Sequence, residues 1–448
     1  MLDCKTVRPR RFAVGGALIL DAAVGKVLND PPTFSDFAHG VLGPTPTPEQ
    51  EAQLLQAVQD WYLPYHTLIS RALPPDPWGP ARLDAVSMIF NRLAGLDIGG
   101  PPTYLIPDNI QPADAPVRYP FMWNAPIQNR TQWPGFADNG NALLGLSRNL
   151  GEVFGVFGIF HPKKDDWRLL QVDYLANNSA DFAGLVALES FIEKIGPPKW
   201  PWPVDTALAA KGKPIYDKEC GSGCHEIKKG KFRSLVGSTW ATPLQDVGTD
   251  IREWGLLGRT VDTGVLSGAP IPLTLKRLQP VDSAFNVLST AVLGTILQRS
   301  VADLDTKPRG EMDASLTRLS PDQAFLLDLK GAFNASRAGA ANAVPTPVYE
   351  ARVMEGIWAA APYLHNGSVP TLAELLKPAA ERVKEFKVGP AYDTVNVGLA
   401  AEQTKFDFTL KTTDCADRNS GNSRCGHEFG TQLSPEDKAA LLEYLKIL

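Results

Sequence analysis

The chain has 448 residues, of which 44% are hydrophobic and 21% are charged, close to the average of soluble globular proteins. The formal net charge is −5, so no basic excess points to a nucleic-acid partner. No run of about 18 uncharged apolar residues occurs, which excludes a membrane-spanning helix from the expected structure. Gly and Pro number 38 each, and this abundance indicates many loops around a helical core.

The start of the chain has two interpretations. Arg8, Arg10 and Arg11 precede an apolar stretch at 12–20, a layout that resembles an export signal. Asp21 interrupts the stretch, and no clean small-residue cleavage site follows it. A processed or residual start is therefore the interpretation we favour, with an intact signal as the alternative.

Helical patterns dominate the first half. Residues 47–63 predict a helix in which Thr47 is the cap and Gln50 completes a capping box. We expect Pro64 to end this helix, because proline removes a backbone donor and clashes with the preceding turn. Residues 100–140 are rich in Pro, Gly, Asn and aromatic residues and predict irregular structure. Further helices are expected at 80–96, 142–160 and 181–196.

A stiff segment divides the chain. Residues 196–205, GPPKWPWPVD, contain four prolines and two tryptophans, and such segments are extended. We therefore predict an N-terminal domain at 1–195, a linker at 196–205 and a C-terminal domain at 206–448. Strand-like alternation is scarce, so the expected fold class is mainly α, with a loop-rich, mostly helical N-terminal domain. Helices are expected in the second part at 206–219, 319–331 and 433–448.

The segment Cys220-Gly-Ser-Gly-Cys224-His225 carries the clearest chemistry. The usual attachment motif for c-type haem is C-x-x-C-H, in which two thiols bind the vinyl groups and the histidine binds the iron. Here the spacer has one residue more, and it must loop out. Two of the three spacer residues are Gly, which tolerates positive φ. The motif therefore predicts one covalent haem c.

Two other interpretations of this segment stay open. Cys220 and Cys224 could form a disulfide beside an incidental His225. A zinc site would need two further ligands, and an adjacent Cys and His rarely fit one tetrahedron. Both are less favoured than haem, because Gly212, Tyr216 and Cys220 would lie on one face of a helix leading into the motif.

Cys415 and Cys425 stand ten residues apart in a polar loop. This spacing suits a disulfide, which would place the chain outside a reducing cytosol; two free thiols are the alternative. Cys4 is left without a partner in either case.

Several segments resemble one known family. GKPIYDKECGSGCHEI at 212–227 is similar to the haem-attachment segment of class I c-type cytochromes. EGIWAAAPYLHNGSVPTLAELL at 355–376 resembles the di-haem cytochrome c peroxidase-like superfamily, in particular the branch that includes the rubber oxygenases. Segments 114–133, 148–157 and 421–448 fit the same branch. The resemblance implies a cytochrome c-like C-terminal domain.

The chain departs from that family in the three-residue spacer and in the absence of a cysteine pair from its first 200 or so residues. Only one haem can be covalently attached, which puts a two-haem peroxidase or oxygenase relay in doubt.

The resemblance implies a distal-side role for His365, so we predict His365 as the sixth iron ligand opposite His225. A second-sphere or packing role for His365 is the alternative. Met354 is a weaker candidate, and no methionine follows it. His427 follows the cysteine loop and is interpreted as a structural or surface residue.

Arg148 and Glu152 lie in a family-like segment. The resemblance to peroxidases suggests that Arg148 pairs with a haem propionate and that Glu152 acts as a catalytic acid or base. The simpler alternative is that the two side chains, four residues apart on a helix, pair with each other.

Two functions follow. The first is an electron-transfer protein in a periplasmic or otherwise extracytoplasmic system, with a redox partner protein and no membrane span. The second is a peroxidase-like or oxygenase-like oxidoreductase acting on peroxide or a small organic substrate. A subunit of a larger redox complex is a further possibility.

Overall fold

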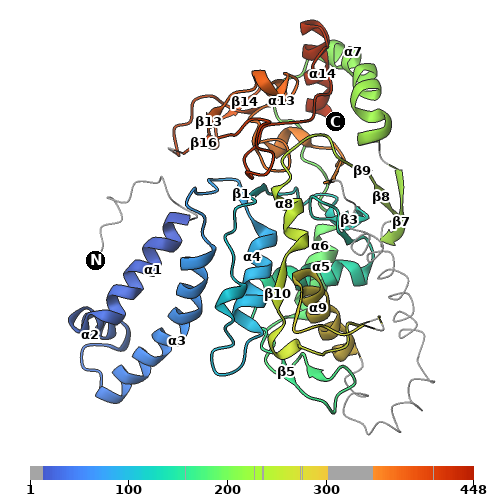
Figure 1. Cartoon of the computed structure of the whole chain (residues 1–448). Coiled ribbons are helices and arrows are strands. Elements are labelled where there is room, and N and C mark those ends of the chain that lie inside the picture. The colour runs from blue at the N-terminus through green and yellow to red at the C-terminus, as the bar shows by residue number, and fades with distance from the viewer. Residues whose placement is uncertain are drawn as a thin grey trace.

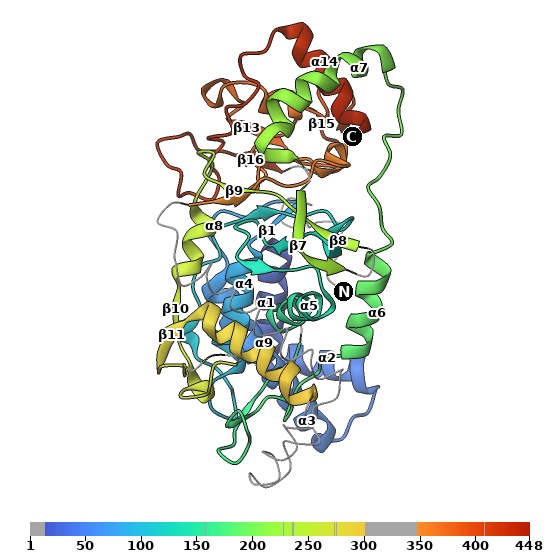
Figure 2. The ribbon, with the colours of Figure 1, turned by 90° about the vertical axis from the view of Figure 1, so that its right-hand side faces the viewer.

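The computed structural model describes residues 14–156, 158–226, 228–234, 237–272, 274, 276–300, 347–406 and 408–448. Helices contribute to both large hydrophobic cores, and every sheet among these residues has two strands, which confirms the mainly α class. Figures 1 and 2 show a lower lobe formed by the earlier part of the chain and an upper lobe formed by α7 and the C-terminal part. The helix expected at 319–331 lies outside the described residues.

The N-terminal helices are α1 (Val14–Asn29), α2 (Pro31–Leu42) and α3 (Pro48–Ala72). The capping box is confirmed, since Gln50 N donates to Thr47 Oγ1 and Thr47 N donates to Gln50 Oε1. The predicted end at Pro64 is wrong, because α3 continues to Ala72. Contacts beyond the proline support this continuation: the Tyr65 hydroxyl donates to Ala17 O at 3.0 Å, and Ala72 is fully buried.

The lower lobe is centred on α4 (Ala85–Arg92), α5 (Ala142–Val156) and α9 (Ala284–Ser300), with α6 (Phe182–Ile192) packed on α5. Helix α4 continues as a π-helix over Leu93–Asp97. The helices expected at 142–160 and 181–196 are present but shorter than predicted. Beyond α5 the chain turns, and Phe160 forms an isolated bridge with Asn178. The largest fully buried side chains of this core are Phe90, Leu93, Ile98, Leu150, Phe154, Phe160, Tyr174, Leu266 and Leu278.

The upper lobe is centred on α7 (Thr206–Tyr216) and α14 (Pro435–Ile447), which lie side by side in Figures 1 and 2. Gly212 permits this close crossing, because a Cβ there would lie 2.0 Å from Ala440 O. The core side chains around the two helices include Phe121, Tyr216, Ile357, Tyr363, Leu372, Leu441 and Leu445.

Short antiparallel pairs connect these helices. The strands are β1 (Arg82–Leu83), β2 (Val117–Arg118), β3 (Arg130–Thr131), β4 (Ala137–Asp138), β5 (Lys163–Lys164), β6 (Val172–Asp173), β7 (Lys228–Ser234), β8 (Gly237–Ala241), β9 (Leu244–Gln245), β10 (Thr260–Asp262), β11 (Val281–Ser283), β12 (Tyr349–Glu350), β13 (Glu385–Lys387), β14 (Tyr392–Asp393), β15 (Gly398–Leu399) and β16 (Thr409–Lys411). The pairs are β1–β2, β3–β4, β5–β6, β7–β8, β9–β12, β10–β11, β13–β16 and β14–β15. Two further short α-helices in the described part of the chain are α8 (Arg252–Gly255) and α13 (Leu372–Leu375).

The two hydrophobic cores do not correspond to the two parts of the sequence on either side of the linker predicted at 196–205. Buried residues from Leu256 to Ile296 pack with residues from Val86 to Phe182 in one cluster. A large part of segment 206–448 thus belongs to the lower lobe. The linker at 196–205 therefore stays a prediction about which parts of the chain fold as separate domains.

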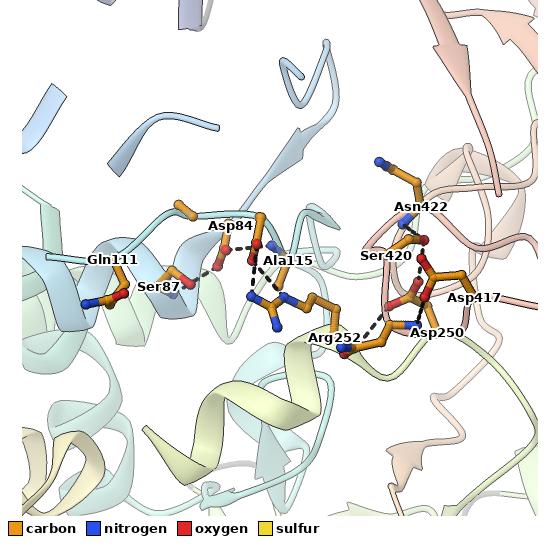
Figure 3. A network of polar contacts seen from close by, with 12 residues as sticks. Asp84, Ser87, Gln111, Ala115, Asp250, Arg252, Asp417, Ser420 and Asn422 are labelled. Atoms are coloured by element: carbon orange, nitrogen blue, oxygen red, sulfur yellow. Dashed lines mark hydrogen bonds and ion pairs between the residues drawn. The ribbon is translucent and has the colours of Figure 1, made fainter. Parts of the chain in front are cut away.

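A polar network joins the lobes (Figure 3). Arg252, at the start of α8, binds Asp114 through two bonds of 2.8 and 2.9 Å. Two residues before Arg252, the Asp250 carboxylate accepts from Ser423 N at 3.0 Å and from Ser420 Oγ at 3.4 Å. The network thus links the lower lobe to the C-terminal loop that contains Ser420 and Ser423.

Among the described residues, no helix has the length and apolar character required to cross a bilayer.

Candidate haem site

The CGSGCH segment begins where α7 ends. Asp205 caps α7 by accepting from Leu208 N at 2.9 Å, and the chain continues as a π-helical segment over Asp217–His225. The helical geometry breaks at Ser222 (ψ 110°) and Gly223 (φ 82°). Positive φ is costly for residues with a Cβ and free for glycine, so Gly223 absorbs the additional spacer residue.

A cavity of about 1210 Å³, including the space at its opening, lies beside this segment. Cys220 and Cys224 line it, and both are free thiols; the structure contains no disulfide between them. No group of three or more His, Cys, Asp or Glu side chains with metal-binding geometry occurs among the described residues, so the zinc interpretation gains no support. The other charged and aromatic lining residues include Arg118, Phe121, Trp133, Tyr349, Arg352 and Tyr363.

His225 is held in one orientation. Its Nδ1 lies 2.6 Å from Arg352 O, so this nitrogen carries the proton that it donates and Nε2 is left free. Burial lowers the pKa of His225. The neutral imidazole is the form that binds a metal, and a hydrogen bond from its other nitrogen fixes the ring.

His427 faces the same cavity. Its ring centroid lies 6.4 Å from that of His225, and two imidazoles bound to one ion through bonds of about 2 Å have centroids about 6 Å apart. Burial, with smaller contributions from His225 and Arg382, lowers the pKa of His427 to about 3. Sequence reasoning missed this residue as a cavity side chain.

The loop before His427 is held from two sides. Cys415 and Cys425 form a disulfide, as the spacing had indicated. The buried Arg382 guanidinium donates to the carbonyls of Arg424 and Gly426, each at 2.7 Å, and to that of His427 at 3.1 Å. His427 has a positive φ of 55°, a conformation that needs such support in a residue with a side chain.

His365 also lines the cavity, but its ring stacks on Tyr349 with centroids 3.9 Å apart. Burial and the charge of Arg118 lower its pKa to about 3. Arg118 N donates to His365 O at 2.9 Å, which fixes the backbone of this loop. The assignment of His365 as the sixth ligand stays a prediction. Met354 lines the cavity as well.

Two arginines flank the cavity. The guanidinium carbons of Arg118 and Arg352 lie 4.5 and 4.6 Å from the Trp133 ring centroid. Burial lowers the pKa of Arg118 to about 9, so this side chain stays charged at neutral pH. Arginine is well suited to pair with carboxylates, the groups that a haem carries at its edge.

These observations fit a haem. The wall offers two free thiols, an oriented imidazole, a second imidazole whose buried Nδ1 has no hydrogen-bond partner, and the Arg118 guanidinium for a carboxylate, whereas Arg352 pairs with Glu350. The rest of the wall is largely apolar, with Val353, Ile357, Leu364, Leu372, Leu375, Leu376, Leu441 and Leu445.

Arg148 and Glu152 line a different cavity. Arg148 forms an ion pair with Glu189 and donates to Asn139 Oδ1 at 2.8 Å, whereas Glu152 accepts from Gln132 Nε2 at 3.1 Å. The suggested contact of Arg148 with a propionate has no support in this arrangement, and neither does direct pairing of Arg148 with Glu152.

The remaining histidines have other partners or lie at the surface. His66 pairs with Asp21 at 2.9 Å, and His161 stacks on Tyr104 and lies 3.5 Å from Asp97. His39 is exposed.

Comparisons with known proteins identify the class of the C-terminal region. Residues 348–387, which include His365, match the family profile described as RoxA-like, cytochrome c-like. The C-terminal part of the chain therefore contains a cytochrome c-like domain, and haem c is the cofactor that it implies.

Two proteins of Sinorhizobium fredii are similar over most of the chain. The uncharacterized protein y4iJ is 28% identical over 409 residues, which cover 83% of this chain and 60% of that protein. The uncharacterized protein y4iM is 24% identical over 374 residues, covering 81% and 67%. The chain thus spans about three fifths to two thirds of the length of these relatives.

Proposed function

We propose that this chain is a mono-haem c-type cytochrome that transfers single electrons to a redox partner protein in an extracytoplasmic system. Cys220 and Cys224 would hold the haem through thioether bonds, and His225 and His427 would bind its iron. The haem supplies a one-electron redox centre.

The observation that carries this proposal is the 6.4 Å separation of the His225 and His427 rings across a cavity that the two thiols also line. Two histidine ligands would leave no open position on the iron for oxygen or peroxide, and this ligation generally gives a lower potential than His/Met. The arrangement favours electron transfer over the peroxidase-like or oxygenase-like alternative.

The residues around the site each contribute to this function. Arg352 O accepts the Nδ1 proton of His225, which leaves Nε2 directed away from the backbone. Arg382 fixes the loop that presents His427. The apolar wall excludes water and Arg118 balances negative charge at the cavity edge.

The extracytoplasmic location is supported by the disulfide between Cys415 and Cys425, because such bonds persist in oxidising compartments. Attachment of haem c in the periplasm would take place in the same compartment as formation of this disulfide.

The test uses the full chain matured in a host that attaches haem c. A pyridine haemochrome assay with protein quantification is expected to give one haem per chain. The ferrous protein is expected to keep a low-spin spectrum under carbon monoxide. Absence of haem would refute the cytochrome assignment, whereas rapid carbon monoxide binding would refute closed axial ligation and support the oxygenase-like alternative.

A further inference from the structure

The lower lobe contains a second cavity that the haem does not use. Its volume is about 930 Å³, including the space at its opening. One face of α5 supplies Leu144, Ser147, Gly151 and Glu152, and α9 lies opposite. The other lining residues are Arg148 and Leu143 from α5, with Val86, Ile89, Phe90, Thr131, Gln132, Phe136, Ala137, Asp138, Phe285, Leu288, Ser289, Val292 and Leu293 from α4, α9 and the β3–β4 region.

The lining does not suit a second haem. Haem iron in proteins is held by His, Cys, Met or Tyr, and none of these is among the described residues that line this cavity. Nor does the lining attract a strongly charged ligand. Arg148 is already paired with Glu189 and bonded to Asn139, so its charge is compensated within the protein.

Hydrogen-bonding groups remain in an otherwise apolar wall. Ser147 Oγ is buried and has no hydrogen-bond partner, which is costly unless a ligand supplies one. The Glu152 carboxyl accepts through Oε1 from Gln132, and burial raises its pKa. Cavities with mostly apolar walls and a few polar groups are typical of small-molecule sites.

We propose that this second cavity binds a neutral organic molecule with an apolar body and one hydroxyl or carbonyl group, which bonds to Glu152 and Ser147. The site is independent of haem attachment. Its wall is shared with the haem cavity through a single segment: Gln132 and Phe136 line the second cavity, and Trp133 between them lines the first.

The test uses the haem-loaded full chain and 2-naphthol as the probe, with binding followed by calorimetry. We expect one site per chain. Naphthalene, which lacks the hydroxyl, should bind about tenfold more weakly, as the loss of one or two buried hydrogen bonds implies. The anionic 2-naphthoate should bind more weakly still.

Substitutions at Gly151 locate the site. A Cβ at this position would meet Val292 Cγ2 at 3.8 Å and Leu288 Cδ1 at 3.9 Å, which are ordinary contacts. Gly151→Leu is therefore expected to fill the cavity and abolish binding, whereas the matched control Gly151→Ala should change the affinity by less than about threefold. Val292→Phe fills the cavity from α9 and replaces Gly151→Leu if that variant does not fold, as judged by its haem spectrum and melting temperature.

Glu152→Met tests the polar end, and it should abolish the preference for 2-naphthol over naphthalene. The proposal is overturned if the filled variants bind 2-naphthol as the parent does. Equal binding of naphthalene, or tighter binding of 2-naphthoate, to the parent chain would overturn the assigned ligand chemistry.

Discussion

The two cavities of this protein are built in different ways. The haem cavity takes its chemically active side chains from three segments far apart in the sequence: His225 from the π-helical segment after α7, and His365 and His427 from two loops. The second cavity lies between helices, and α5 alone supplies Ser147, Arg148 and Glu152. Loops can bring unrelated residues to one point, whereas a helix offers a fixed row of side chains. The first arrangement suits a metal with defined ligand directions, and the second suits an apolar molecule.

The largest effect should follow removal of the thiols. Cys220→Ala combined with Cys224→Ala leaves no group for thioether bonds, so covalent haem should fall by more than about tenfold when measured by haem staining of denatured protein. Ser222→Ala, in the spacer, is the control and should keep full haem. Retention of covalent haem by the double variant would refute the attachment site.

The next experiment separates the two candidate axial histidines. His427→Ala should convert a low-spin to a high-spin spectrum and allow carbon monoxide to bind, because it opens one iron position. His365→Ala is the matched control, since it removes an imidazole that lines the same cavity but is stacked on Tyr349; its spectrum should stay low-spin. The reverse result would assign the sixth position to His365, as the sequence predicts.

A third experiment asks whether the two lobes unfold together. Burial raises the pKa of Asp84 in the lower lobe to about 6, above its ordinary value, so the folded state binds this proton more tightly than the unfolded state. The resulting stabilisation is complete below pH 4 and is lost as the pH rises through about 6, with a loss of up to about 3 kcal/mol in the free energy of unfolding.

Urea unfolding of the haem-loaded protein between pH 4 and 7 measures the slope of the free energy of unfolding against pH. Asp84→Asn should reduce the slope, and Asp76→Asn, at an exposed position, should leave it unchanged. If haem absorbance and tryptophan fluorescence show different pH slopes, the lobes unfold separately and the network in Figure 3 does not couple them.

The smallest effect concerns the spacer. Gly223→Ala places a Cβ at φ 82° and should cost about 1–2 kcal/mol of stability, seen as a lower melting temperature of the haem-loaded protein. Gly221→Ala is the control, because its Cβ would make an ordinary contact of 3.5 Å with Tyr216. Equal melting temperatures of the two variants would show that the spacer relaxes around the substitution.

The sequence predicted the features that depend on residues close to one another along the chain. The capping box at Thr47 and Gln50 is confirmed, and the mainly α class follows from helical periodicity. The prediction that Pro64 ends its helix is wrong because packing on α1 outweighs one missing donor. Similarly, residues 256–296 contain no signal for which core they join, since that depends on tertiary packing.

The candidate haem site likewise contains residues that the sequence predicts and residues that it does not. Cys220, Cys224 and His225 form a contiguous motif, so the sequence alone predicts them as haem-binding residues. His427 lies about 200 residues further along, and its approach to His225 depends on Arg382 and on the loop closed by Cys415 and Cys425. Its position next to this cysteine loop, in Cys-Gly-His, was the available signal, since a cross-linked loop can hold a side chain rigidly.

The network that binds Asp250 to Ser420 and Ser423 bears on the order of biogenesis. The residues proposed to attach the haem form one contiguous segment, Cys220–His225, so they are adjacent before the rest of the C-terminal part has folded. Placement of His427 requires the C-terminal loop to close its disulfide and then dock on the lower lobe. The pair of histidines proposed to bind the iron would therefore be complete only when the last part of the protein has folded.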